Sequence, residues 1–420
     1  MQEITDPLEH KLLKNKFCRQ PWDTFGIKGS KSKHSVQVCC HDGTGAVGKM
    51  NWEDPMKAWN SPGAQELRST ILDGSFKKCI ASKCMMLTRL VDREYAKTKP
   101  YYKNILDNNL TKLETVPPLV SHDTDFTCNL SCPSCRTNLN FNNSKTHQEK
   151  VKHELTTIVE KFPKLALLNL SGSGDPFASF GARDWLLNFD PDKYPHLKFD
   201  IRTNGTMLTP RLWNRLSNIH NSINELRIST DAATEKTYNK LRPGGNWNVL
   251  LRNIENISKN TEKFQFCIDI VVQTDNFREL PDCVKLGRSF EIDGMKLGEI
   301  QNFGHFSEDE LFEKQVWKPE HKYHTELIEI MQDPIFKDMP LLSSRVTELI
   351  PSWYVKWPMR SPENRNMLHD TDEGRNIILR SGIWSAKNRN EIMRMLLAYP
   401  KFKEQIVEHF KTFVNHGTTF

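Results

Sequence analysis

The sequence has no long hydrophobic run, no apolar N-terminal leader and no strong excess of either charge. No apolar stretch in its 420 residues is long enough to span a bilayer, and residues 1–16 contain acids where a secretory signal would be apolar. The net charge of +6 is mild for this length, and no stripe of basic and aromatic residues favours nucleic acid. We therefore expect a cytoplasmic protein with no membrane contact.

Cysteine, in contrast, is plentiful and clustered, with ten in the chain. In a reducing compartment, closely spaced cysteines indicate metal ligands more readily than disulfides. Cys128, Cys132 and Cys135 are spaced C-x3-C-x2-C directly after a strand-like run, and no fourth Cys or His follows nearby. A zinc knuckle completed by a distant residue, or three unrelated buried thiols, are the alternatives. Cys267 and Cys283 lie inside regular segments and are predicted to be buried in the core.

Three thiolates within eight residues can converge on one small group. An iron–sulfur cubane takes four thiolates, so three would leave one iron open to another ligand. The spacing therefore predicts a [4Fe–4S] cluster with an open iron, held by Cys128, Cys132 and Cys135.

The N-terminal region contains a second set of cysteines. Cys18, Cys79 and Cys84, with one of the adjacent pair Cys39 and Cys40, supply four thiolates, enough to close a cluster. Neighbours on a strand point to opposite faces, so we expect one of the pair to be a ligand and favour Cys40. A zinc ribbon would suit the same four thiolates.

The middle of the chain alternates strand-like and helix-like segments, the pattern of a parallel α/β sheet. Loops that follow the strands are where such folds place their chemistry. Helices are predicted at 147–162, 182–189, 209–219, 248–259 and 280–290. The six predicted strands are 119–125, 164–172, 197–205, 225–231, 264–273 and 294–301.

Glycine and polar residues gather at or just after the ends of these strands. Glycines let the backbone approach a ligand closely, and Arg suits a carboxylate partner. The segments concerned are Ser171–Pro176, Thr203–Gly205, Ile228–Asp231, Lys240–Gly245 and Val272–Asn276.

The cysteine triplet and the strand-end segments together resemble the radical SAM superfamily. The resemblance implies a six-stranded partial TIM barrel in which S-adenosylmethionine (SAM) binds the open iron. It also implies reductive cleavage of SAM to a 5′-deoxyadenosyl radical, which takes a hydrogen atom from the substrate. One departure is Ser134, which stands where an aromatic residue often lies against the adenine.

The same resemblance implies a set of SAM contacts. Asp175 stands where a Glu that binds the SAM amino group is usual, Thr203 lies near the ribose, and Arg242 would pair with the SAM carboxylate. The implied contacts are Ser134, Gly172, Gly174, Asp175, Thr203, Ser229 and Arg242.

The N-terminal region resembles the SPASM/twitch module, which carries an auxiliary [4Fe–4S] cluster. The features concerned are the Cys-x-x-Pro-Trp start at Cys18, the Cys-Cys pair, the stretch Ala58–Ser61, Leu67-Arg68 and the closing cysteines. The module usually follows the radical core, and here it precedes it. The implied ligands of the second cluster are Cys18, Cys40, Cys79 and Cys84.

The expected organisation is an auxiliary-cluster module at 1–96, a radical SAM core at 97–304 and a helical C-terminal region at 305–420. The resemblance implies a radical SAM enzyme acting on a peptide, protein or carbohydrate-type substrate, with flavodoxin or ferredoxin as electron donor. One alternative is a radical SAM enzyme acting on a nucleotide or nucleic acid. The other is a zinc-stapled, non-catalytic binding protein.

Overall fold

A computed structural model describes residue 13 and residues 15–29, 34–39, 45–79, 90–170, 173–259, 263–338 and 341–342. The chain forms two compact units. As far as they are described, the first unit comprises 1–129, 140–203 and 215–223, and the second comprises 130–139, 204–214 and 224–420.

The first unit is built on a mostly parallel sheet. β6, β7 and β8 pair in parallel, and each overlaps a predicted strand. Short antiparallel strands extend the sheet at its other edge, where β3 pairs with β2 and β4. In sheet order, the strands are β8 (Lys198–Thr203), β7 (Leu167–Leu170), β6 (Leu119–Asp123), β2 (Thr24–Lys28), β3 (Ser35–Gln37) and β4 (Gly48–Lys49).

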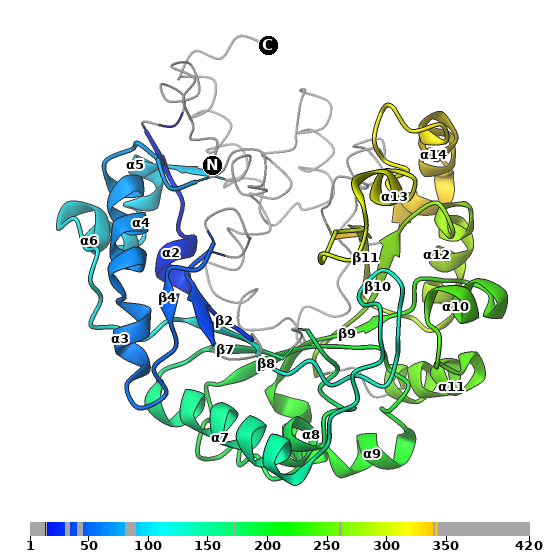
Figure 1. Cartoon of the computed structure of the whole chain (residues 1–420), viewed down its shortest axis with the longest axis horizontal. Coiled ribbons are helices and arrows are strands. Elements are labelled where there is room, and N and C mark those ends of the chain that lie inside the picture. Colours follow the sequence, from blue (N-terminus) through cyan, green and yellow to red (C-terminus); the bar gives the residue numbers. More distant parts are fainter. Residues whose placement is uncertain are drawn as a thin grey trace. The chain divides into compact units, whose positions relative to one another are not determined.

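Helices pack on this sheet through aromatic and aliphatic side chains. Trp185 of α8 meets Phe199 of β8 edge to face at 6.0 Å, and Phe162, which follows α7, meets Phe25 of β2 in the same way at 5.8 Å. α7 and α8 lie side by side (Figure 1). The helices of this unit are α2 (Gln20–Asp23), α3 (Pro55–Trp59), α4 (Pro62–Leu72), α5 (Arg93–Ala96), α6 (Pro100–Asp107), α7 (Lys145–Lys161) and α8 (Phe180–Leu187).

The N-terminal residues extend the sheet of the predicted core. β2 runs parallel to β6, with Thr24 opposite Leu119 and Lys28 opposite Asp123, and the Lys28 Nζ lies 2.5 Å from Asp123 Oδ2. A short strand pair, β1 (Lys16–Phe17) with β5 (Val91–Asp92), lies apart from this sheet. A separate module at 1–96 stays a prediction, and β2, which lies within that range, pairs with β6 of the predicted core.

Arg68 provides much of the internal bonding of the N-terminal region. Its side chain is fully buried and donates to the carbonyls of Pro21 (2.8 Å), Thr111 (2.8 Å) and Trp59 (3.1 Å). A buried guanidinium is stable only when its N–H groups are paired. Arg68 therefore links α2, α3 and the segment before β6 through backbone acceptors.

The second unit is a smaller parallel sheet. β9, β10 and β11 pair in parallel, and β12 (Leu341–Leu342) adds to β11. Figure 1 shows α10, α11 and α12 along one side of these strands. The elements are β9 (Ile223–Ser229), β10 (Gln265–Val272), β11 (Gly294–Glu299), α9 (Pro210–Arg215, its last residue in the first unit), α10 (Glu235–Leu241), α11 (Trp247–Ser258), α12 (Leu280–Ser289), α13 (Glu308–Phe312) and α14 (His324–Met331).

Burial follows the expected pattern of a parallel sheet. Most of β10 is buried on both faces, as is typical of strands covered on both sides. Cys267 of β10 and Cys283 of α12 are buried, which confirms that both lie in the core. The mixed α/β fold and mostly parallel sheet agree with the prediction, while closure into a six-stranded barrel stays a prediction.

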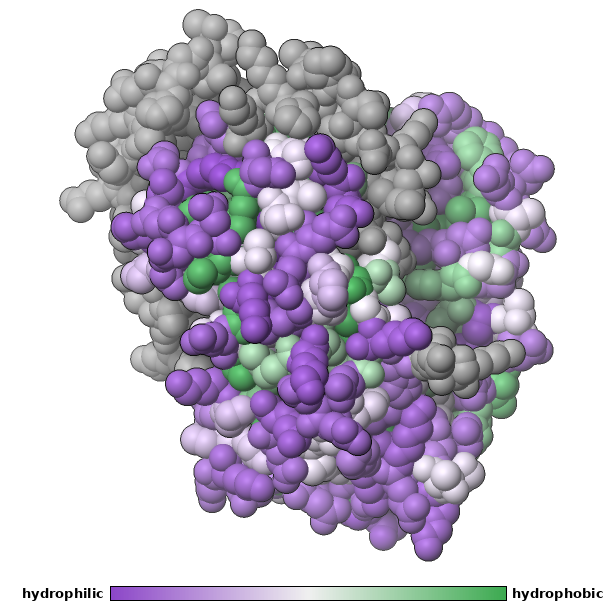
Figure 2. All heavy atoms as spheres, turned by 60° about the vertical axis from the view of Figure 1, so that its left-hand side comes forward, coloured by the Kyte–Doolittle hydropathy of each residue, from purple (hydrophilic) through white to green (hydrophobic). Residues whose placement is uncertain are grey.

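The surface turned to the viewer in Figure 2 is mostly hydrophilic, with hydrophobic residues in small separate groups. Of the helices that the structure describes, none is long and apolar enough to cross a membrane. Of the predicted helical C-terminal region at 305–420, residues 343–420 lie outside the described residues.

Candidate cluster and SAM site

The three cysteines of the triplet lie in the loop after β6. Cys128 belongs to the first unit, and Cys132 and Cys135 belong to the second. Cys128 and Cys132 are buried, whereas Cys135 is exposed. The backbone N–H groups of Cys135 and Arg136 both donate to the carbonyl of Cys132, at 2.9 and 3.0 Å, so a tight turn joins the second and third cysteines.

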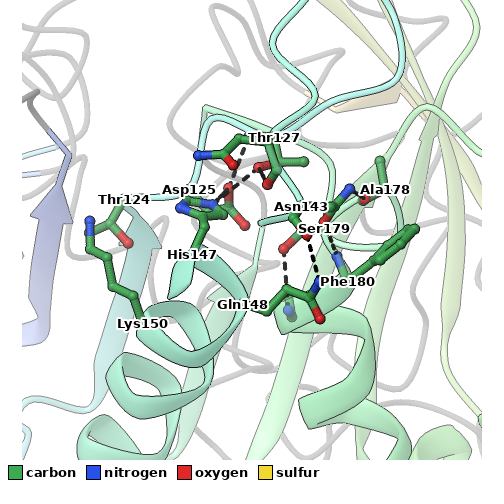
Figure 3. A network of polar contacts seen from close by, with 12 residues as sticks. Thr124, Asp125, Thr127, Asn143, His147, Gln148, Lys150, Ala178, Ser179 and Phe180 are labelled. Atoms are coloured by element: carbon green, nitrogen blue, oxygen red, sulfur yellow. Dashed lines mark hydrogen bonds and ion pairs between the residues drawn. The ribbon is translucent and has the colours of Figure 1, made fainter. Parts of the chain in front are cut away.

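In the first unit, the residues before Cys128 are held by a polar network (Figure 3). The Thr127 N–H donates to Asp125 Oδ1 at 2.9 Å, and His147 Nε2 of α7 lies 3.0 Å from the same oxygen. The Thr127 hydroxyl donates to the carbonyl of Asn142 at 3.0 Å, and the Cys128 N–H donates to that of Asn140 at 2.7 Å. The backbone that leads into Cys128 is thus fixed by hydrogen bonds from two other segments.

Asp125 is ionised in this network. Burial raises the pKa of its carboxyl, but hydrogen bonds from His147, Ser179 and Thr127 outweigh that effect and lower the pKa to about 2. Ser179 also caps α8, where its hydroxyl accepts from the Ala182 N–H at 3.2 Å. One carboxylate therefore connects the loop after β6 to both α7 and the start of α8.

The glycine-rich segment after β7 packs directly on this loop. A Cβ on Gly174 would lie 2.5 Å from the Thr127 carbonyl oxygen and 2.6 Å from that of Asp125. The Asp175 N–H donates to the Thr127 carbonyl at 2.8 Å. Glycine is required at 174 because backbone oxygens occupy the space of a side chain.

The carboxylate of Asp175 is buried and already accepts hydrogen bonds. Its Oδ1 accepts from the N–H groups of Phe177 (3.0 Å) and Ala178 (3.2 Å), and its Oδ2 accepts from the hydroxyl of Thr203 (2.8 Å). The structure therefore brings together two of the predicted SAM contacts, Asp175 and Thr203. Gly172 lies outside the described residues.

A second buried network in the first unit is formed by Glu154, His122 and Thr124. Glu154 Oε2 of α7 lies 3.0 Å from His122 Nε2 and accepts from the Thr124 hydroxyl at 2.6 Å. Burial raises the pKa of Glu154, but His122 and Thr124 reverse this and leave the pKa below its usual value. This network ties the end of β6 to α7.

In the second unit, Arg242 contacts the second cysteine. Its Nη2 lies 2.7 Å from Asp231 Oδ2, and its Nη1 lies 3.8 Å from Cys132 Sγ, within the range for a hydrogen bond to sulfur. Burial lowers the pKa of Arg242, but Asp231 and Cys132 raise it well above the usual value, so the guanidinium stays charged. Burial raises the pKa of the Cys132 thiol, and Arg242 opposes that increase.

Asp231 is held in a special conformation. It is fully buried with a φ of +57°, a region that Asp tolerates better than most residues. The Val271 N–H donates to its Oδ1 at 2.7 Å, and Asn276 Nδ2 donates to its carbonyl at 2.9 Å. Ser131 directly precedes Cys132 in the chain. Its N–H donates to the carbonyl of Pro243 at 3.2 Å, which joins the cysteine loop to the segment after α10.

The remaining predicted contacts of the second unit are Ser134, half-buried in the loop, and Ser229, half-buried at the end of β9. Of the proposed second set of thiolates, Cys18 and Cys79 are buried in the first unit, as is Cys39. Cys40 and Cys84 lie outside the described residues.

Within the described part of the chain, no three Cys, His, Asp or Glu side chains are arranged to hold a single metal ion. A cubane is larger than one ion and keeps each thiolate on a different iron, so its ligands stand farther apart. Chain connectivity limits the separation of Cys128 and Cys132 to about 14 Å. A buried thiol next to a guanidinium suits a thiolate ligand, so the environment of Cys132 fits a cluster.

Sequence reasoning missed three side chains that hold this loop. From the sequence, Asp125 and Asp231 are the last residues of the predicted strands 119–125 and 225–231, and His147 is the first residue of the predicted helix 147–162. Acids at the ends of parallel strands were the available signal for Asp125 and Asp231. Nothing in the sequence points to His147, because its partner lies 22 residues away in the chain.

Comparison with known proteins finds one matching family model. Residues 126–286 match the model of the radical SAM superfamily. The match covers less than half of the chain. No curated protein matches.

Several solved structures are similar. SuiB from Streptococcus suis, bound to S-adenosylmethionine, is 15% identical with a TM-score of 0.36, over 49% of this chain and 43% of that one. TYW1 with a lysine-pyruvate adduct is 14% identical with a TM-score of 0.34, over 53% and 74%. The enzyme anSMEcpe with bound AdoMet and a peptide is 18% identical with a TM-score of 0.33, over 46% and 55%. The chain spans less than half of that SuiB chain.

Proposed function

We propose that this chain is a radical SAM enzyme in which Cys128, Cys132 and Cys135 hold the catalytic [4Fe–4S] cluster. The observation that carries the proposal is the C-x3-C-x2-C loop after β6, at the start of the segment that matches the superfamily. When bound, the cluster and SAM would supply reductive cleavage of SAM and hydrogen abstraction from the substrate.

The residues of each unit would have distinct tasks. In the first unit, Gly174 lets the backbone after β7 approach the cysteine loop, and Asp175 and Thr203 form a bonded pair beside it. In the second, Ser134 and Ser229 would orient SAM, and Arg242, which the resemblance assigns to the SAM carboxylate, contacts Asp231 and Cys132. Gly172 is also among the proposed SAM contacts.

A second, auxiliary cluster is also proposed, with Cys18, Cys40, Cys79 and Cys84 as ligands. The burial of Cys18 and Cys79 is compatible with that role. Four protein ligands leave no open iron, so the auxiliary cluster would transfer electrons and not bind SAM. A peptide, protein or carbohydrate-type substrate and a flavodoxin or ferredoxin donor remain proposals that rest on the sequence resemblance.

The first test is anaerobic reconstitution followed by a SAM-cleavage assay with a strong chemical reductant. The expected result is about two [4Fe–4S] clusters per chain and formation of 5′-deoxyadenosine. Replacing Cys128, Cys132 and Cys135 together by Ala should abolish 5′-deoxyadenosine while one cluster remains. The matched control is Cys283→Ala, a buried cysteine of α12 outside both sets. Zinc without labile sulfide, or activity in the triple variant, would refute the proposal.

A second test addresses the auxiliary cluster. The sequence pattern predicts that Cys40→Ala loses one cluster and that Cys39→Ala keeps both. In the structure, Cys39 lies two residues past the end of β3. Replacing Cys79 and Cys84 should lower product formation but leave uncoupled SAM cleavage. Retention of two clusters in both single variants would remove the N-terminal site.

A further inference from the structure

We propose that Arg242 acts on the catalytic cluster itself, as a positioning residue that stabilises the Cys132 thiolate and raises the reduction potential of the cluster. This inference rests on the proposed cluster and goes beyond it, since the resemblance assigned Arg242 to the SAM carboxylate. It follows from two contacts of Arg242 within the second unit, with Asp231 and with Cys132.

The geometry commits Arg242 to the protein. One terminal nitrogen lies 2.7 Å from Asp231 and the other lies 3.8 Å from Cys132 Sγ, so both ends of the guanidinium fork are occupied. The side chain of Asp231 is fully buried and that of Arg242 is about nine-tenths buried. Such a pair keeps one orientation, because breaking it would leave an uncompensated buried charge.

Asp231 is fixed in turn by the strands around it. Its carboxylate accepts from the Val271 N–H, and its carbonyl accepts from Asn276, so neither can rotate freely. Its left-handed backbone conformation also costs free energy, which the surrounding contacts must offset. The contacts therefore run from the Val271 N–H to the Asp231 carboxylate, from there to the Arg242 guanidinium, and from the guanidinium to the Cys132 sulfur.

The electrostatic consequence has a definite sign. Reduction adds one negative charge to a cluster, and hydrogen bonds and positive charge at its sulfurs make that addition more favourable. Arg242 supplies both at Cys132. Asp231 is farther along the same chain of contacts and partly cancels the charge, so the two residues should shift the potential in opposite directions.

The experiment measures the potential of the catalytic cluster by anaerobic redox titration monitored by electron paramagnetic resonance, without SAM. Reconstituted full-length protein is compared with Arg242→Gln, Arg242→Lys and Asp231→Asn. The Cys79/Cys84 double Ala variant serves as the background, so that one cluster contributes to the signal. Arg252→Gln, at an exposed position of α11, makes the same charge change away from the loop and is the matched control.

Arg242→Gln should shift the potential to more negative values and release iron to a chelator about tenfold faster. Asp231→Asn should shift it to less negative values. Arg242→Lys should recover part of the potential, because it keeps the charge but cannot reach both partners. Arg252→Gln should behave as the parent protein.

A SAM-free potential unchanged in Arg242→Gln would overturn the inference, and weakened SAM binding in that variant would then restore the carboxylate role. Shifts of the same sign in Arg242→Gln and Asp231→Asn would also overturn it, since that indicates structural disturbance. If Arg242→Gln loses its cluster entirely, the direction of the potential shift in Asp231→Asn and in Arg242→Lys tests the inference instead. Absence of any cluster from the parent protein would instead refute the proposed function.

Discussion

The residues before Cys128 and the second cysteine, Cys132, are held by different kinds of interaction. Before Cys128, in the first unit, the loop is fixed by shape and by many hydrogen bonds, including those of Thr127 and the close contact with Gly174. At Cys132, in the second unit, the main side-chain contact is with a charged, buried Arg242. Backbone packing positions a ligand, whereas a buried charge also alters its electronic properties.

This contrast predicts that changes in the first unit act through stability and cluster uptake, and changes in the second through potential. The largest effect is expected at Gly174. Gly174→Ala would place a Cβ within 2.6 Å of two backbone oxygens, so we expect it to destabilise the protein by about 3 kcal/mol and reduce iron uptake.

The measurement is urea unfolding of the apo-protein together with iron content after reconstitution. Gly26→Ala is the control, because the nearest atom to a Cβ there is 3.7 Å away. Equal stability of the two variants would show that the segment after β7 can move aside.

Glu154→Gln should have the next largest effect. The variant keeps the size but removes the charge that accepts from Thr124 and pairs with His122, so we expect a loss of about 2 kcal/mol. Glu149→Gln, a more exposed change on the same helix, should cost little. If both cost the same in urea unfolding, the buried network contributes nothing specific.

Asp125→Asn should produce a pH-dependent loss. Since the folded pKa is about 2 and the ordinary pKa of an aspartate is 3.8, ionised Asp125 stabilises the protein fully above the unfolded pKa, by about 2 kcal/mol. That contribution falls as the pH drops through the folded pKa. The difference in unfolding free energy between parent and variant should therefore be constant from pH 6 to 5 and shrink below pH 4.

The control is Asp192→Asn, at an exposed position of the first unit. If the difference in unfolding free energy between the parent and Asp125→Asn does not change with pH, the variant loses stability through altered hydrogen-bond geometry and not through the lost charge.

The smallest effect is expected at His305, which contacts a backbone carbonyl of the cysteine loop in the second unit and not a cysteine sulfur. Its Nε2 lies 2.8 Å from the carbonyl oxygen of Pro133, and His305→Ala should cost about 0.5 kcal/mol. The potential should remain that of the parent. A potential shift as large as that of Arg242→Gln would show that any loosening of the loop has this effect, and the contrast between the units would fail.

Sequence periodicity was sufficient for the elements of the α/β region. The strands β6 to β11 overlap predicted segments, and α9 begins within the predicted helix 209–219, where the Leu212 N–H donates to the Thr209 hydroxyl at 3.3 Å. These features depend on neighbours in the chain, and local patterns record them. β2 was missed, because its partner β6 lies about 90 residues away and a five-residue segment containing Gly26 gives no local signal.

By itself, the sequence determined which thiols are close enough to act together, since the spacing of Cys128, Cys132 and Cys135 is covalent. Only the tertiary structure decided what surrounds them. Gly174 lies against Thr127, Asp175 is bonded to Thr203, and Arg242 is directed at Cys132 by Asp231, although these pairs are separated by 28 to 110 residues or belong to different elements. Spacing along the chain is a property of the sequence, whereas the orientation of a buried side chain depends on which distant atoms can satisfy its hydrogen bonds and charge.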